Sequence, residues 1–137
     1  MTLDETLPSI ELFSELSKKE LKNIVSLMTP IRVKAGKVLT EEGAPGREFM
    51  IIIEGNATVR RKGKILARLG PGDFFGELAV VAGVPRTATV IADTDMVIET
   101  LNRREFSSLL DESPRIAKKV LVGAVRRLHE IEESVIR

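Results

Sequence analysis

The chain has 137 residues, 43% of them hydrophobic, and its 21 basic residues nearly balance its 20 acidic ones, for a formal net charge of +1. This length suits one domain, residues 1–137, with its own core, and the near balance of charge argues against direct DNA binding. There is no cysteine for disulfides or thiolate metal sites, no apolar run long enough to span a membrane and no secretory signal, so a cytoplasmic location is expected.

The first zone, residues 8–29, is predicted to be helical. Ser17 with Glu20 three residues later is the capping-box pattern that marks a helix N-terminus. Beyond it, apolar residues recur at the spacing of one helix face, at Leu21, Ile24, Val25 and Met28. Pro30 is expected to close this helix, because proline cannot continue it.

The second zone, residues 31–101, is predicted to be a sandwich or barrel of short strands. Seven β-prone runs are expected, at 31–33, 38–40, 49–54, 57–61, 65–69, 87–92 and 96–101. Lys62-Gly63-Lys64 separates two of them and is typical of a hairpin tip. Seven glycines are assigned to turns on the basis of their conformational freedom: Gly36, Gly43, Gly46, Gly55, Gly63, Gly70 and Gly72.

The third zone, residues 103–136, is predicted to be helical again. Phe106, Leu109 and Leu110 indicate a short amphipathic helix, and Ser113-Pro114 then supplies an N-cap with proline at the first helical position. The following apolar stripe consists of Ile116, Val120, Ala124, Leu128, Ile131 and Val135. Such a helix could cover an opening of the barrel or form a homodimer with a second copy, and the sequence leaves both open.

Two charged residues nine positions apart suggest a binding site. Arg86 can donate two parallel hydrogen bonds to a phosphate, and the ionised carboxylate of Glu77 can accept one from a ribose 2′-hydroxyl. Gly76 would let the backbone approach a ligand closely. A ligand with a ribose and a compact phosphodiester is a cyclic nucleotide, while the alternative is an ordinary surface ion pair.

Further stretches extend this pattern over nearly the whole chain: Leu12-Phe13 with Leu16-Ser17, Ala35-Gly36-Lys37-Val38-Leu39, Glu42-Gly43-Ala44-Pro45-Gly46, Glu54-Gly55, Leu69 to Glu77, Pro85 to Val90, Phe106 and Ser113-Pro114. Together they resemble the cyclic nucleotide-binding domain family of kinase regulatory regions, nucleotide-gated channels and catabolite-activator-type regulators. The resemblance implies an α+β fold, in which an antiparallel eight-stranded β-roll, a jelly-roll-like barrel, is flanked by N-terminal helices and C-terminal lid helices.

The resemblance also implies a ligand-binding set. Arg86 would bind the cyclic phosphate together with backbone N–H groups near Thr87 and Ala88, while Glu77 and the backbone of Gly76 would hold the ribose. In the lid helix, Arg127 falls where some channel members place an arginine on the base, and the alternative is a solvated arginine paired with nearby glutamates. The full expected set is Gly76, Glu77, Leu78, Ala79, Arg86, Thr87, Ala88 and Arg127.

The expected function is a regulatory sensor that signals by rearrangement of the lid helix. cAMP is the favoured ligand and cGMP the alternative, since the Thr87 hydroxyl could bond the guanine 2-amino group. The effector would be a separate protein or a domain downstream. No cofactor, metal ligand or catalytic residue is expected, because a cupin-type enzyme needs clustered histidines and the chain has only His129. The competing interpretation is a nucleotide-free roll that acts as a protein-interaction module.

Overall fold

The computed structural model describes residues 10–136, so the first two residues of the predicted N-terminal helical zone lie outside it. The helices are η2 (Glu11–Phe13), α2 (Lys18–Val25), α3 (Glu77–Ala82), α4 (Arg103–Glu112) and α5 (Pro114–Ile136). The strands are β1 (Thr29–Val33), β2 (Val38–Thr40), β3 (Glu48–Glu54), β4 (Ala57–Arg61), β5 (Lys64–Leu69), β6 (Phe74–Phe75), β7 (Thr89–Ala92) and β8 (Met96–Asn102).

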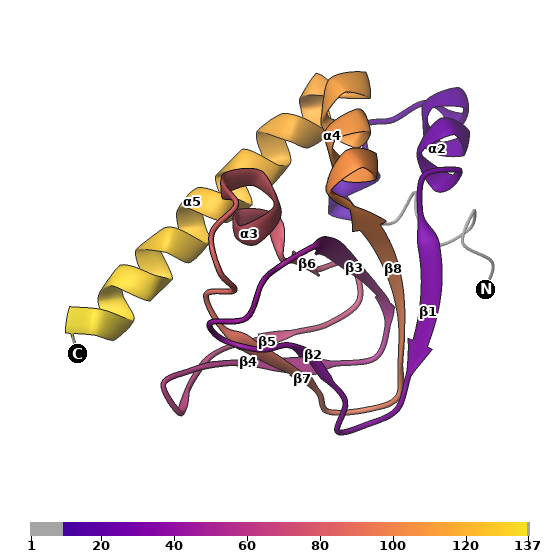
Figure 1. The fold of residues 1–137 in the computed structure, drawn as a ribbon. Helices are drawn as coiled ribbons and strands as arrows, with labels where there is room; N and C mark the ends of the chain where they lie inside the picture. The colour runs from indigo at the N-terminus through magenta and orange to yellow at the C-terminus, as the bar shows by residue number, and fades with distance from the viewer. Residues whose placement is uncertain (1–9, 137) are drawn as a thin grey trace.

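The strands form two four-stranded antiparallel sheets, with the orders β1-β8-β3-β6 and β2-β7-β4-β5. The helices gather on the side of the first sheet, away from the second, and α5 extends past the roll to the C-terminus (Figure 1). This arrangement confirms the expected antiparallel β-roll flanked by helices.

The core has two parts that share strand β3. Phe49, Ile51 and Ile53 belong to the cluster under the helices, whereas Met50 and Ile52 belong to the cluster between the two sheets. Successive side chains of a strand point to opposite faces, so β3 is buried on both. This double burial explains why its sequence is continuously apolar rather than alternating.

The caps predicted from sequence are present. The Ser17 hydroxyl accepts a hydrogen bond from the Glu20 N–H at 3.2 Å, and the Glu20 carboxylate accepts one from the Ser17 N–H at 3.1 Å. The Ser113 hydroxyl accepts one from the Ile116 N–H at 3.3 Å, at the start of α5. The hairpin tip between β4 and β5 is also confirmed, with positive φ at Lys62 and Gly63.

Several expected boundaries differ from those of the structure. Helix α2 ends at Val25 rather than continuing to residue 29, and Pro30 lies inside β1, opposite Glu99 of β8. Burial of Met28 beneath the helices produces the apolar spacing that suggested a longer helix. Strand β6 was not expected, since two residues carry no periodicity, and β7 begins at Thr89 rather than at residue 87.

The apolar stripe proposed for α5 holds only at its start. Ile116 and Val120 are buried, but Leu128 is exposed. Residues four apart in an α-helix differ by about 400°, so a row at this spacing drifts by roughly 40° per step and leaves the buried face. Ile131 and Val135 have side chains outside the described part of the structure.

Candidate functional site

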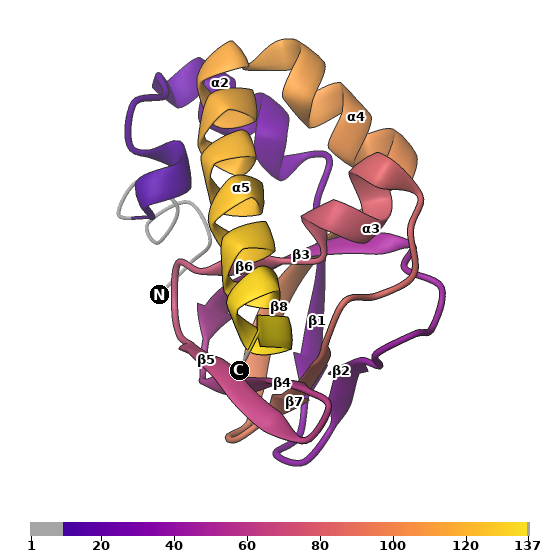
Figure 2. The same ribbon diagram turned by 90° about the vertical axis from the view of Figure 1, so that its left-hand side faces the viewer.

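One cavity of about 60 Å³ lies between the roll, α3 and α5. Figure 2 shows α5 lying in front of β6 with α3 beside it. The structure brings all eight expected residues to the wall of this cavity: Gly76, Glu77, Leu78, Ala79, Arg86, Thr87, Ala88 and Arg127. Four further residues complete the wall, namely Thr40, Val59, Phe75 and Val90.

Arg86 is a buried cation, and the protein supplies acceptors for only some of its hydrogen-bond donors. Its side chain donates from Nη2 to the carbonyl of Glu48 at 2.9 Å and from Nη1 to the carbonyl of Gly76 at 3.3 Å. It makes no ion pair with any carboxylate among the described residues, although it is only 8% exposed. Burial lowers the pKa of Arg86, and the charges of Glu48 and Glu77 partly oppose this. An anion in the cavity would therefore complete its environment.

The loop before β3 fixes the backbone of Arg86. The Gly43 N–H donates to the Arg86 carbonyl at 2.9 Å, and the Arg86 N–H donates to the Ala44 carbonyl at 2.8 Å. Gly46 lies directly beneath the side chain, where an added Cβ would be 2.4 Å from the Cβ of Ala79 and 2.8 Å from the Cδ of Arg86. Since the φ of Gly46 is not positive, its assignment to turn geometry is corrected: glycine is required there for space.

Gly76 must be glycine for two reasons, its backbone conformation and the lack of space for a side chain. It caps α3 with φ of 93°, in the left-handed region. An added Cβ would lie 2.6 Å from Nη1 of Arg86 and 2.7 Å from the carbonyl oxygen of Glu48. Gly76 was expected to let the backbone approach a ligand closely. In this structure it is the Arg86 side chain that lies close to the Gly76 backbone.

Glu77 is 1% exposed and pairs with the last helix. Nη1 of Arg127 lies 2.5 Å from each of its carboxylate oxygens, and Nη2 of Arg127 donates to the carbonyl of Phe74. The guanidinium also lies 5.3 Å from the centre of the Phe74 ring, within cation–π range. Arg127 thus holds α5 on the cavity and occupies the carboxylate that was expected to face a ribose.

Phe74 and Gly123 are contributors that sequence reasoning missed. A Cβ on Gly123 would lie 2.7 Å from the Phe74 ring, so this glycine lets α5 rest directly on the aromatic side chain. Glycine inside a helix costs about 1 kcal/mol relative to alanine. A glycine in the middle of the predicted α5 was therefore the available signal for a close contact.

The segment just before β7 also contributes to the cavity wall. The Thr40 hydroxyl donates to the carbonyl of Ala88 at 3.0 Å and ties β2 to this segment. Thr87 is half-buried on the cavity wall, and its hydroxyl has no hydrogen-bond partner within the described residues. A polar group thus faces the cavity beside Arg86.

Two further classes of feature were searched for in residues 10–136. No group of three or more histidine, aspartate or glutamate side chains in this range is placed to hold a metal ion. None of the helices described there combines the length and the apolar composition needed to cross a membrane.

Comparison with known proteins places these features in a family. The sequence model described as the cyclic nucleotide-binding domain matches residues 30–113, which is more than half of the chain. Two curated relatives are cyclic nucleotide-gated potassium channels, from Mesorhizobium japonicum (35% identical) and Rhizobium etli (36% identical). Each match covers 87% of this chain and 33% of the channel, so the chain spans about a third of the length of these relatives.

Solved structures agree. The cAMP-bound regulatory subunit PfPKA-R superposes with a TM-score of 0.85 and 25% identity, over 97% of this chain and 46% of that one. The catabolite activator protein of Thermus thermophilus gives a TM-score of 0.79 and 26% identity, over 90% of this chain and 61% of that one. The fold, the cavity and the sequence match together show that the chain belongs to the cyclic nucleotide-binding domain family.

Proposed function

We propose that this chain is a cytoplasmic cyclic-nucleotide sensor with cAMP as its preferred ligand. The observation that carries the proposal is the state of Arg86, a buried cation on the cavity wall whose only acceptors among the described residues are two carbonyls. A guanidinium has five N–H donors, so donors remain for a cyclic phosphodiester. PfPKA-R, which is bound to cAMP in its solved structure, supports the choice of ligand.

In this proposal each part of the nucleotide meets one part of the wall. The phosphate binds Arg86 and backbone N–H groups near Thr87 and Ala88. The ribose 2′-hydroxyl donates to Glu77, whose ionised carboxylate is an acceptor only. The base lies toward α5, where the Arg127 guanidinium can stack on it once released from Glu77.

Binding requires a rearrangement of α5. Pockets for small ligands usually measure about 300–1,000 Å³, whereas this cavity measures about 60 Å³. Arg127 also occupies the carboxylate that the ribose would use. The nucleotide must therefore displace Arg127, and the resulting shift of α5 is the signal passed to a separate effector protein or to a downstream domain.

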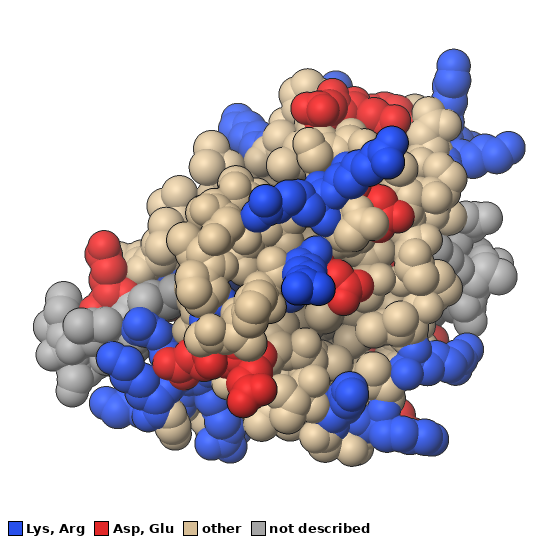
Figure 3. All heavy atoms as spheres, in the orientation of Figure 1, with Lys and Arg blue, Asp and Glu red and all other residues tan. Residues whose placement is uncertain are grey.

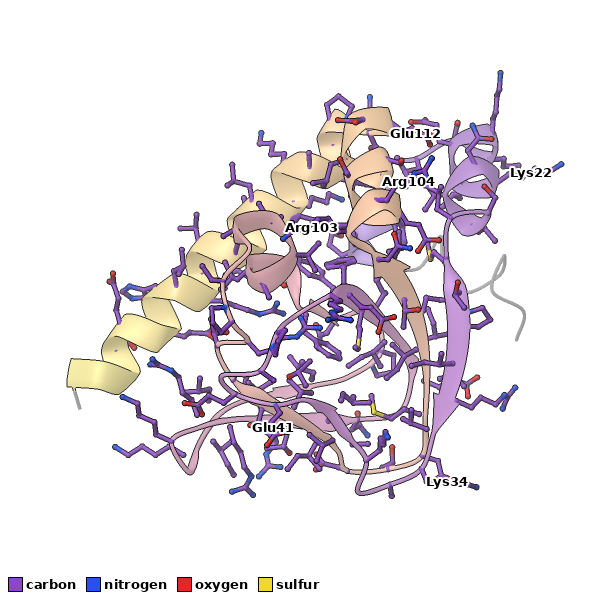
Figure 4. The ribbon with its side chains drawn as sticks, in the orientation of Figure 1. Lys22, Lys34, Glu41, Arg103, Arg104 and Glu112 are labelled. Carbon is purple, nitrogen blue, oxygen red and sulfur yellow. The ribbon has the colours of Figure 1, made fainter. Side chains whose placement is uncertain are left out.

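The first experiment is calorimetric titration with cAMP and with cGMP. The native protein should bind cAMP more tightly, and Arg86→Ala should lose at least about two decades of affinity for both, since the lost contact is a buried charged one. Arg104→Ala is the matched control, because Arg104 is an exposed arginine on α4 without a partner in the described structure (Figure 4). Absence of heat with folded, ligand-free native protein would instead favour the protein-interaction module.

The lid movement has its own test. Amide hydrogen exchange of residues 114–136 is expected to change when cAMP saturates the protein, because α5 loses its contact with Glu77. Exchange in strand β3, which is buried on both faces, should stay constant and serves as the internal control. Equal exchange of α5 with and without cAMP would contradict the rearrangement.

A further inference from the structure

The loop that joins β2 to β3 is hydrogen-bonded along the segment that carries Arg86. The Arg86 backbone bonds Gly43 at 2.9 Å and Ala44 at 2.8 Å. The residue before them, Glu42, donates its N–H to the Thr89 hydroxyl at 3.0 Å. Three consecutive loop residues thus hold the segment from its start at Arg86 to its end at Thr89, so a shift of the loop would also shift the groups proposed to bind the phosphate.

The side chain of Glu42 joins this loop to another part of the roll. Its Oε1 atom accepts a hydrogen bond from the Lys62 N–H at 3.0 Å, at the tip of the β4–β5 hairpin. Strand β7 lies between β2 and β4 in the sheet. The half-buried Glu42 side chain therefore bridges from the end of β2 to the hairpin tip, across the point where the segment of Arg86 enters β7.

The pairing of the hairpin strands does not account for this bond. Arg61 pairs with Lys64, so the loop consists of Lys62 and Gly63 alone, and both have positive φ, as in a type I′ turn. The Lys62 N–H lies outside the ladder of β4 with β5, and at an exposed tip water can satisfy such a donor. A carboxylate twenty positions away in the sequence accepts it instead.

The charge of the hairpin tip favours a carboxylate beside it. Four of the five residues at positions 60–64 are basic. Figure 3 shows basic and acidic side chains gathered at the lower left of the molecule, where the hairpin ends in Figure 1. Since opposite charges attract, this positive surroundings stabilises Glu42 in its bridging position.

We propose that Glu42 is a positioning residue for cyclic-nucleotide binding, an inference that rests on the function proposed above. Glu42 does not line the cavity formed by the described residues, so it acts through the loop and not by touching the nucleotide. By tying the loop to the hairpin, it holds Arg86 and the N–H groups near Thr87 and Ala88 in place for the phosphate. Donors that are already ordered lose less conformational freedom on binding, and this raises the affinity.

Calorimetric titration with cAMP tests this role. Glu42→Ala should weaken binding by about two- to tenfold, the value of one ordinary hydrogen bond. Glu42→Gln keeps an oxygen that can accept the Lys62 N–H, so its affinity should stay within about twofold of the native value. Glu41→Ala is the matched control, because Glu41 is the preceding residue and is exposed (Figure 4).

Amide hydrogen exchange of the ligand-free protein, measured by NMR, gives a readout that needs no nucleotide. In Glu42→Ala the Lys62 amide loses its acceptor and should exchange faster. If the bridge holds the loop, the Gly43 and Arg86 amides should also exchange faster, because each forms a bond between the loop and the segment. Amides of β3, which is buried on both faces, serve as the internal control.

Three outcomes would overturn the proposal. Faster exchange at Lys62, with native exchange at Gly43 and Arg86, would show that Glu42 only caps the hairpin. Native cAMP affinity in Glu42→Ala would exclude a role in binding, and equal losses in Glu42→Ala and Glu42→Gln would exclude the hydrogen bond as its cause. Failure of the native protein to bind either nucleotide would instead refute the proposed function, and the exchange at Gly43 and Arg86 would still decide separately whether Glu42 holds the segment.

Discussion

Arg127 and Glu77 are fifty residues apart in sequence, yet Nη1 of the arginine lies 2.5 Å from both carboxylate oxygens of the glutamate. The carboxylate is almost fully buried and the arginine side chain is 27% exposed. An ionised carboxylate in such a place needs a partner, since an unpaired buried charge is costly. Arg127 therefore satisfies the buried carboxylate and holds α5 against the wall of the cavity.

Removal of this arginine should destabilise the protein. Arg127→Ala leaves Glu77 buried without its cation, and the free energy of unfolding is expected to fall by up to about 3 kcal/mol, the lower end for a broken buried pair because Arg127 is partly exposed. Urea unfolding of the ligand-free protein measures this loss. Arg126→Ala is the matched control, because Arg126 is an exposed neighbour on the same helix.

A double variant shows whether the effect passes through Glu77. If it does, Glu77→Gln in the Arg127→Ala background should recover part of the stability, since a neutral amide costs less to bury than a carboxylate. A double variant as unstable as the sum of the two single variants would show that Arg127 acts instead through Phe74.

Local signals account for most of the fold that the sequence predicted. The capping box at Ser17, the cap at Ser113 and the hairpin tip at Lys62-Gly63 depend on neighbouring residues, and all three are present. The short strand β6 exists only because Phe74 and Phe75 pair with Met50 and Ile51 of β3. Such a pairing is tertiary and leaves no periodicity in the sequence.

The site likewise has a part that local sequence patterns predict and a part that depends on tertiary structure. Residues 76–88 form one short stretch, and the pattern that identified them is local. The pairing of Glu77 with Arg127 could not be predicted from the sequence, because this pairing depends on the path of α5 over Phe74. The sequence suggested for Arg127 either a nucleotide base or a solvated pairing with nearby glutamates, whereas in the structure it pairs with Glu77, a buried glutamate fifty residues away.

Thr87 should influence which nucleotide is preferred. Its hydroxyl lies on the cavity wall without a partner in the described structure, and a guanine 2-amino group would supply a donor. Thr87→Ala is expected to lower cGMP affinity by about two- to tenfold, the value of one ordinary hydrogen bond, and to leave cAMP affinity unchanged. Titration with both nucleotides gives the ratio, and Thr87→Ser should retain native selectivity. An equal loss for both ligands would show that Thr87 contacts the shared phosphate or ribose.

Gly46 should affect binding through Arg86. In Gly46→Ala the new methyl group would overlap Ala79 and the Arg86 side chain, so both must move. We expect a stability loss of about 1–3 kcal/mol from overpacking, together with weaker cAMP binding. Gly70→Ala is the control: its φ is also not positive, and its Cβ would meet only the Asn56 side chain at 3.1 Å. Native affinity in Gly46→Ala would contradict the role assigned to this glycine.

Glu99 is a second buried carboxylate, and it lies outside the cavity. It is 2% exposed on β8, between Pro30 of β1 and Ile51 of β3. Proline has no N–H to offer, and the Oε2 atom of Glu99 has no hydrogen-bond partner within the described residues. Burial therefore raises the pKa of Glu99 above its ordinary value of 4.5.

This raised pKa predicts a pH dependence of stability. Between 4.5 and the pKa of Glu99 in the folded state, the folded protein binds more protons than the unfolded chain, so the free energy of unfolding falls as pH rises through this window. Glu99→Gln cannot ionise, so the variant should lack this component and be at least as stable as the native protein at neutral pH. Urea unfolding from pH 4.5 to neutral pH measures the difference, with Glu54→Gln, an exposed glutamate on β3, as control. If the free energy of unfolding changed with pH in the same way for the native protein and for Glu99→Gln, Glu99 would take up no proton on folding. That result would contradict the prediction.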